Sequence, residues 1–172
     1  MRDRTDRGGA AATSLSPKAR GRRVAIVTSR YHDAITSKLE EGAIEAFREA
    51  GGEEGDLVRC SSPGAFELVA IASALAARSD LDGVVALGCI VAGETRHDRY
   101  LAAAVAQSLA DLSARHMKPV AFGVLTVNEL KQARDRAGGR VGNKGREAMD
   151  AVILAAETIA EVARPATTGA RP

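Results

Sequence analysis

The chain has 172 residues and a mass of 17.9 kDa, a length that favours one compact domain and suffices to bury a hydrophobic core. Charged residues make up 27% of the chain and apolar residues 45%, a composition that argues against intrinsic disorder. No stretch without charge exceeds 11 residues, as in residues 83–93, whereas a membrane-spanning helix needs roughly 20. We therefore expect no membrane anchor.

Positive charge is concentrated at the N-terminus. Residues 1–23 hold seven Lys or Arg and two Asp, which leaves 17 basic and 20 acidic residues in the remainder. Residues 1–21 are too polar to fold alone and lack the apolar centre of a secretory signal, so we expect a disordered basic tail. An arm that binds nucleic acid, or a targeting sequence, is the minor alternative. The expected folded domain then spans residues 22–164, with a C-terminal tail over residues 165–172.

Short apolar runs alternate along the chain with amphipathic segments. The expected strands are residues 22–29, 56–60, 83–89 and 119–125, and the expected helices are residues 35–50, 63–78, 98–115, 128–137 and 144–163. Asp33 and Asn143 are the expected caps of the first and last helices. Strands that alternate with helices form parallel sheets covered on both faces. The predicted fold class is therefore α/β: a flavodoxin-like three-layer α/β/α sandwich with a four-stranded parallel sheet.

The two cysteines favour a structural role. Cys60 and Cys89 lie in apolar runs with no Cys-x-x-Cys pair and no His at ligand spacing, so we expect buried thiols in a reducing, cytoplasmic environment. Glu94 and His97 have the spacing of one half of some di-metal sites, but a second copy of that motif is absent. We expect no metal site.

The loops after the strands carry the candidate functional residues, because ligands bind beyond the carboxyl ends of strands in parallel sheets. Aromatic Tyr31 and Phe66 lie in two of these loops. In a third, His97 is the candidate acid or base near neutral pH, and a surface or capping histidine is the alternative. Thr95 in the same loop has the simpler interpretation of a helix cap. Residues 138–145 (GGRVGNKG) follow a helix and end in glycine, which argues against a nucleotide phosphate loop.

Four blocks of sequence, in order, resemble the 6,7-dimethyl-8-ribityllumazine synthase family. They are residues 63–68 (PGAFEL), 93–97 (GETRH), 122–126 (FGVLT), and the pair 136–138 (RAG) and 142–145 (GNKG). The resemblance covers residues 22–163. It implies an enzyme of riboflavin biosynthesis that joins 5-amino-6-(D-ribitylamino)uracil to 3,4-dihydroxy-2-butanone 4-phosphate, releasing phosphate and water, without metal or organic cofactor.

The resemblance also implies a set of site residues. His97 would be the catalytic residue, and Tyr31 would stack on the pyrimidinedione ring of the substrate. Further substrate contacts would come from Ala65, Phe66 and Glu67 to the ribityl chain; from Cys89, Ile90 and Val91 to the ring edge; from Glu94, Thr95 and Arg136 to the phosphate; and from Phe122 and Lys144 of a neighbouring subunit.

Two positions depart from the family pattern. Arg99 stands where the family usually has an Asp after the catalytic His, and Ala92 stands where it commonly has an Arg. If the usual Asp supports the imidazole, Arg99 disfavours the imidazolium, and Asp98 compensates only if its side chain turns back.

The resemblance further implies a homopentamer with active sites between subunits, a 60-subunit icosahedral shell in some members, and riboflavin synthase as a partner. Two alternatives remain open: a weakly active flavin- or lumazine-binding paralogue, and a scaffold that uses the shell alone. We expect small-molecule substrates and neither nucleic acid nor a membrane as a partner.

Overall fold

The computed structural model describes residues 16–165. Its elements, in chain order, are β1 (Val24–Ser29), α1 (Asp33–Glu49), a short 3-10 turn η1 (Glu54–Asp56), β2 (Leu57–Ser62), α2 (Leu68–Ala76), β3 (Gly83–Val91), α3 (His97–His116), β4 (Val120–Val127), α4 (Leu130–Arg136), β5 (Ala137–Gly139), β6 (Gly142–Asn143) and α5 (Lys144–Val162). None of the helices within residues 16–165 combines the length and the apolar character needed to cross a membrane.

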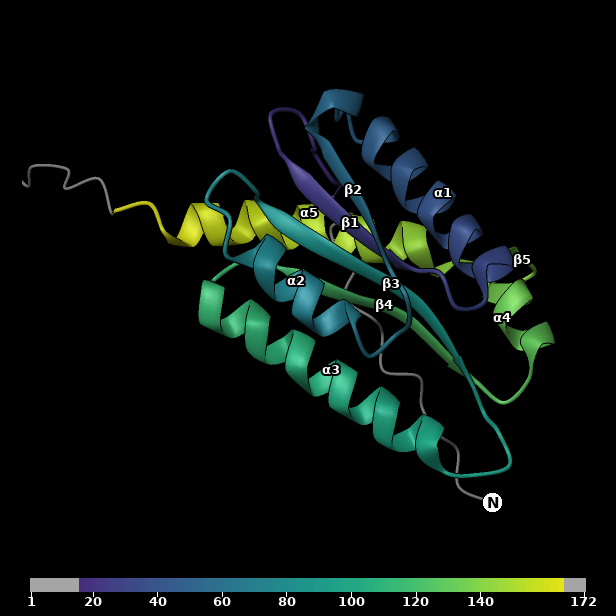
Figure 1. Cartoon of the computed structure of the whole chain (residues 1–172). Coiled ribbons are helices and arrows are strands. Elements are labelled where there is room, and N and C mark those ends of the chain that lie inside the picture. The colour runs from purple at the N-terminus through teal and green to yellow at the C-terminus, as the bar shows by residue number, and fades with distance from the viewer. Residues whose placement is uncertain (1–15, 166–172) are drawn as a thin grey trace, which may run out of the picture.

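Four strands form one parallel sheet in the order β2-β1-β3-β4 (Figure 1). Helices α1 and α5 cover one face, and α2 and α3 cover the other. The α/β class, the three layers and the four-stranded parallel sheet expected from the alternation of strands and helices are therefore confirmed.

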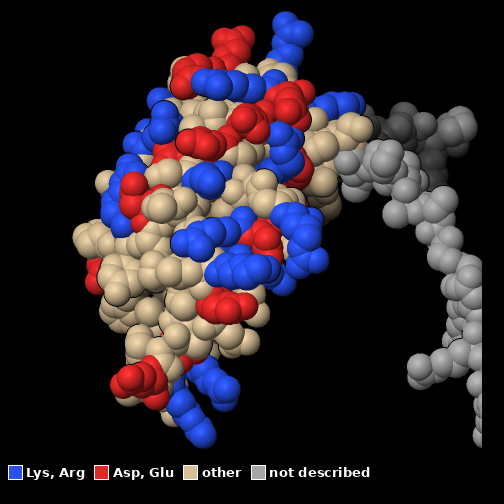
Figure 2. Space-filling model, turned by 90° about the vertical axis from the view of Figure 1, so that its right-hand side faces the viewer, with Lys and Arg blue, Asp and Glu red and all other residues tan. Residues whose placement is uncertain are grey.

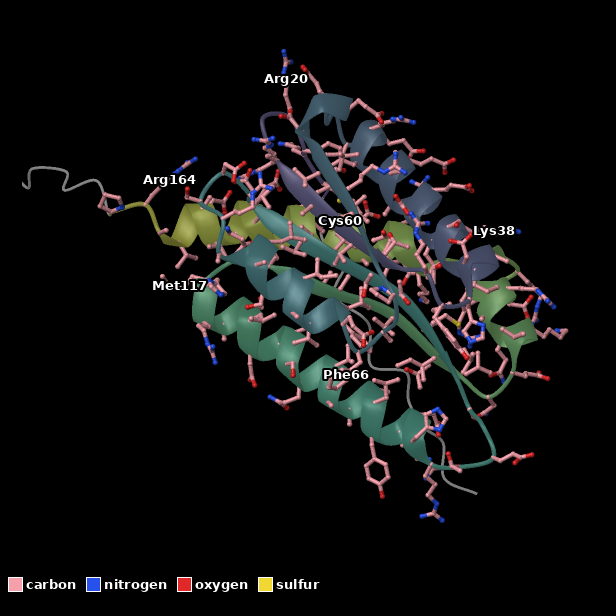
Figure 3. The ribbon with its side chains drawn as sticks, in the orientation of Figure 1. Arg20, Lys38, Cys60, Phe66, Met117 and Arg164 are labelled. Carbon is pink, nitrogen blue, oxygen red and sulfur yellow. The ribbon has the colours of Figure 1, made fainter. Side chains whose placement is uncertain are left out.

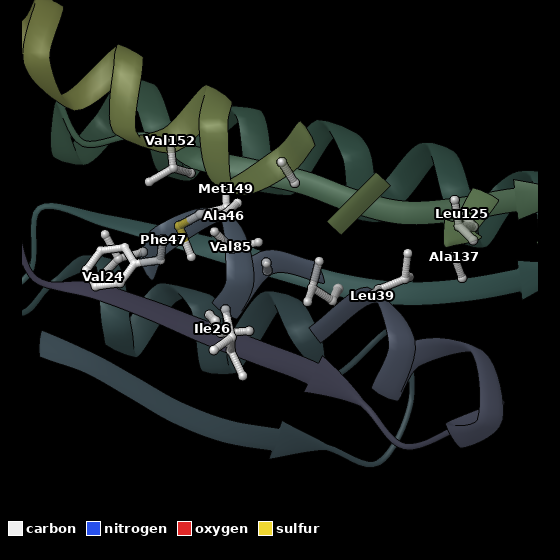
Figure 4. Close-up of a cluster of buried hydrophobic side chains, with 14 of the residues drawn as sticks. Val24, Ile26, Leu39, Ala46, Phe47, Val85, Leu125, Ala137, Met149 and Val152 are labelled. Atoms are coloured by element: carbon white, nitrogen blue, oxygen red, sulfur yellow. The ribbon is translucent and has the colours of Figure 1, made fainter. Parts of the chain in front are cut away.

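The core has two halves, one on each face of the sheet. Along β3, Val85 and Leu87 point to the α1–α5 side while Val84 and Ala86 point to the α2–α3 side, as the two-residue period of a strand requires. Figure 4 shows the first half, in which Phe47 of α1 meets the sheet beside side chains of α5. Both faces are buried because a helix layer covers each.

Four helix starts differ from the sequence expectation. Helix α4 begins at Leu130, two residues later than expected. Helix α2 begins at Leu68, five residues later than expected, because residues 63–67 form a turn in which the Ser62 hydroxyl donates to the Gly64 carbonyl (2.8 Å). Asp33 does not cap α1: the cap position is His32, in a left-handed conformation (φ 63°). Thr95 does not cap α3, which begins at His97 without a side-chain cap. Asn143 caps α5 as expected.

Two smaller features were also not expected. Strands β5 and β6 form a short antiparallel hairpin whose backbone turns at Gly138 and Gly142, both at positive φ, where glycine is favoured. Cys89 is buried as expected, but Cys60 is only half-buried because β2 is an edge strand of the sheet.

The folded domain includes residues that precede residue 22, the expected domain boundary. The Ala19 side chain is fully buried, and its backbone N–H donates to the carbonyl of Ala50 (2.8 Å). Residues 1–15 and 166–172, which make up most of the two expected tails, lie outside the described residues.

Candidate active site

Backbone hydrogen bonds join the loops at the carboxyl ends of the strands. The Arg30 N–H donates to the Ser62 carbonyl, which links the exits of β1 and β2, and the Ala92 N–H donates to the Val127 carbonyl, which links the exits of β3 and β4 (2.8 Å each). Side chains carried by these loops are therefore held on a common rim.

A hollow of about 460 Å³ opens at this rim, and we call it the His97 hollow. It gathers eight of the residues expected from the sequence: Tyr31, Ala65, Phe66, Glu67, Cys89, Ile90, Val91 and His97. His32, Gly64, Gly93 and Leu101 complete its lining. Three segments that are distant in sequence therefore meet at one place, as the strand-exit argument predicted.

Aromatic side chains stand at the mouth of the His97 hollow. Tyr31 and Phe66 are 66% and 65% exposed, although large aromatic side chains are usually covered. Figure 3 shows Phe66 at the start of α2, on the side of α3. Exposed π faces beside a concave surface suit a flat heterocyclic ligand.

The polar groups of the His97 hollow differ in chemistry. The Thr95 hydroxyl and the Nδ1 atom of His97 lie at hydrogen-bond distance (2.8 Å). The Glu67 carboxylate folds back over Gly64, where a Cβ atom would lie 2.9 Å from Oε2. Burial raises the pKa of the Cys89 thiol to about 11, so Cys89 is neutral at physiological pH and unsuited to act as a nucleophile.

A second hollow of about 500 Å³ follows the outer edge of β4, and we call it the Lys144 hollow. It contains Phe122, Arg136 and Lys144, and it shares no lining residue with the His97 hollow. Lys144 is paired with Glu147 (2.6 Å), and Arg136 donates to the carbonyl of Gln132 (3.2 Å). The structure thus divides eleven of the thirteen expected site residues between two separate hollows.

Glu94 and Thr95 line neither hollow. They lie exposed in the loop that precedes α3, and the side chain of Arg96, at the cap position of that helix, makes no capping hydrogen bond. Backbone N–H groups at the start of a helix that lacks a cap can stabilise an anion.

One lining residue, His32, was missed in the sequence as a functional candidate. Its ring packs edge-on against Tyr31 (centroids 4.7 Å apart, planes at 75°), and its carbonyl accepts from the N–H groups of Ile35 and Thr36. The sequence feature that could have indicated His32 was its position directly after Tyr31, in the loop that follows the first strand.

Residues 142–145 (GNKG) start helix α5 and hold its first residue, Lys144, against α1. Asn143 Oδ1 accepts from the N–H groups of Gly145 (2.8 Å) and Arg146 (3.3 Å), which starts α5. A Cβ atom at Gly145 would collide with the backbone carbonyl of Leu39 in α1. Gly145 therefore permits the close approach of α1 and α5, which fixes the position of the Lys144 backbone.

Charge on this side of the molecule is mixed. Figure 2 shows the side toward which the strands point, with Lys and Arg interspersed among Asp and Glu and beside uncharged areas. Within residues 16–165, no three His, Cys, Asp or Glu side chains gather closely enough to hold a metal ion.

Comparison with known proteins agrees with this geometry. The sequence profile of 6,7-dimethyl-8-ribityllumazine synthase matches residues 21–160. The chain belongs to that family. It is 41% identical over 153 residues to the 6,7-dimethyl-8-ribityllumazine synthase of Thermus thermophilus, an alignment that covers 88% of this chain and 98% of that one.

Other relatives of the same name have similar identities. The match to Sulfurimonas denitrificans is 44% identical and covers 77% of this chain and 86% of the relative. The match to Chlorobium phaeobacteroides is 45% identical and covers 80% and 89%. Membership of the family therefore extends over nearly all of the described domain.

Proposed function

We propose that this chain condenses 5-amino-6-(D-ribitylamino)uracil with 3,4-dihydroxy-2-butanone 4-phosphate to form 6,7-dimethyl-8-ribityllumazine. The observation that carries the proposal is family membership over residues 21–160. The His97 hollow adds a physical reason, because it places exposed aromatic faces, a carboxylate and an imidazole around one concave surface.

The His97 hollow takes the pyrimidine substrate. The ring stacks on Tyr31, and the backbone at the end of β3, residues 89–91, meets its polar edge. Residues 65–67 hold the ribityl chain, with the Glu67 carboxylate accepting hydrogen bonds from its hydroxyl groups.

The butanone phosphate lies between the start of α3 and a cationic group. Uncapped N–H groups and the positive end of the α3 dipole favour the phosphate there, beside Glu94 and Thr95. The Arg136 guanidinium neutralises the phosphate charge, a task that suits its planar array of donors. The two substrates then meet next to His97.

A neighbouring copy completes the site. Phe122, Arg136 and Lys144 lie in a hollow that shares no residue with the His97 hollow, so one chain does not surround both substrates. Two different surfaces of the same chain facing each other make a head-to-tail contact, and such contacts form a ring when the rotation between neighbours closes. We propose a homopentamer in the cytoplasm, from which a 60-subunit shell is the larger alternative.

Mixed oligomers test this sharing of the site. His97→Ala and Lys144→Ala each impair a different half of the site. Reassembling equal amounts of the two variants from unfolded chains therefore restores complete sites at about a quarter of the contacts. Activity above that of either pure variant is the expected result. Mixed oligomers with no more activity than the parents would place both halves in one chain. Light scattering on the wild type gives the number of subunits.

Proton transfer is the chemical task assigned to His97. An amine must attack a ketone, phosphate must leave and a ring must close, so one group has to accept and donate protons near neutral pH. Much of the remaining acceleration comes from holding two substrates together, since both reacting groups are already activated. Loss of the imidazole should therefore slow the reaction without abolishing it.

A time course of lumazine absorbance and fluorescence tests the function directly. Purified wild type and His97→Ala are mixed with the two substrates, beside a reaction without protein. Turnover by the wild type that is reduced in the variant supports the synthase. Quenching of added riboflavin fluorescence without any turnover would instead assign the chain to the binding paralogues, and neither effect would favour a scaffold.

A further inference from the structure

The His97 side chain has one hydrogen-bond partner within residues 16–165. That partner is the Thr95 hydroxyl, whose Oγ1 lies 2.8 Å from Nδ1. The ring also packs over Gly93, where a Cβ atom would approach the Cε1 atom of His97 to 3.3 Å. One edge of the imidazole thus faces its own loop. Because His97 also lines the hollow, the remaining nitrogen, Nε2, is the one left for the substrates.

The two side chains that follow His97 do not support the imidazole. Asp98 is buried (8% exposed) but makes no hydrogen bond to His97 in the part of the chain that the structure describes. Arg99 is exposed and cationic, so it offers no acceptor to an N–H group. The hydrogen-bond partner of the imidazole is therefore Thr95, which precedes His97 in the sequence, and not one of the two residues that follow it.

We propose that Thr95 is the positioning residue of His97, an inference that rests on the proposed function. Nδ1 carries a hydrogen and donates it to Oγ1 of Thr95, which leaves Nε2 as the atom that exchanges protons with the substrates. When Nε2 takes a proton, Nδ1 keeps its own, so the bond to Thr95 lasts through both states of the ring. The hydroxyl carries no charge in either state.

This role differs from the phosphate contact expected of Thr95 from the sequence. A hydroxyl that accepts from Nδ1 still has its own hydrogen to donate. At the start of α3 the Arg99 N–H donates to the Arg96 carbonyl, which leaves the N–H groups of His97 and Asp98 for the phosphate. The two roles therefore predict different kinetic effects. Loss of a positioning contact lowers kcat, whereas loss of a phosphate contact raises the KM of the phosphate substrate.

Three variants separate these roles in the full chain. Thr95→Val keeps the shape but removes the hydroxyl, Thr95→Ser keeps the hydroxyl, and Thr158→Val is a matched control on α5, distant in the fold from the His97 loop. We expect Thr95→Val to lower kcat about three- to tenfold, the loss of one hydrogen bond, with both KM values unchanged. Thr95→Ser should retain most of the activity, and Thr158→Val all of it.

Each alternative outcome has a defined meaning. An unchanged kcat in Thr95→Val, or a raised KM for the phosphate substrate alone, overturns the positioning role while the synthase stands. A wild type without turnover overturns the proposed function and this inference with it. If Thr95→Val does not fold, the nitrogen NMR spectrum of histidine-labelled wild type decides: a hydrogen on Nδ1 of neutral His97 supports the proposal, and one on Nε2 overturns it.

Discussion

Replacing Asn143 by alanine should destabilise the protein by about 2 kcal/mol. The side chain makes two kinds of contact: Oδ1 caps α5 by accepting from Gly145 and Arg146, and Nδ2 donates to the Lys38 carbonyl at the other helix, α1 (2.8 Å). Loss of an N-cap costs about 1 kcal/mol, and loss of the second contact about as much. For a chain of this size, we expect the midpoint of thermal unfolding to fall by about 4–8 °C.

Asn143→Ser separates the two contributions. Serine is a good N-cap but is too short to reach the Lys38 carbonyl, so it should recover about half of the loss. Asn128→Ala is the matched control, because Asn128 is exposed and, among the described residues 16–165, its side chain makes no hydrogen bond; its backbone N–H donates to Gln132. Thermal unfolding followed by circular dichroism, at one protein concentration for all variants because assembly raises the midpoint, measures the difference.

Two outcomes would contradict the roles assigned to the Asn143 side chain. If Asn143→Ser is as unstable as Asn143→Ala, capping contributes nothing and the contact between α5 and α1 carries the whole effect. If the unfolding midpoint of neither variant differs from that of Asn128→Ala, neither contact of Asn143 contributes to stability.

Three further predictions concern other positions. Gly145→Ala should cost about 3 kcal/mol or more because its Cβ collides with α1, while Gly55→Ala, with no atom within 4 Å, should unfold like the wild type; equal denaturation midpoints would contradict this. Alkylation of the native protein at pH 8, followed by peptide mass spectrometry, should label Cys89 slowly, because it is 2% exposed and burial raises its pKa to about 11; rapid labelling would disprove the burial. The hydrogen bond from Arg78 lowers the pKa of Asp80 from 3.8 to about 2, so its stabilisation is present above about pH 4 and lost as the pH falls toward 2; the difference in unfolding midpoint between wild type and Asp80→Asn should shrink over that range, and a constant difference would oppose the assignment.

The sequence by itself determined the order of the layers. Apolar runs of strand length alternate with segments of helical periodicity, and this alternation predicts a parallel sheet between two layers of helices. Local chemistry also fixed one helix end, because the amide of Asn143 needs only the N–H groups two and three residues further along. The candidate side chains followed from the same logic, since every strand exit of a parallel sheet reaches one rim.

Contacts between distant segments decided the rest. Only the packed chain shows that Lys144 and His97 line separate hollows, because their separation depends on where β4 and α5 lie in the assembled layers. Helix α2 starts late because residues 63–67 form a turn, although Pro63 and the following residues also suit a helix. Local pattern cannot rank such alternatives when the deciding free energy comes from tertiary packing. The pairing of Thr95 with His97 likewise became visible only with the loop in three dimensions.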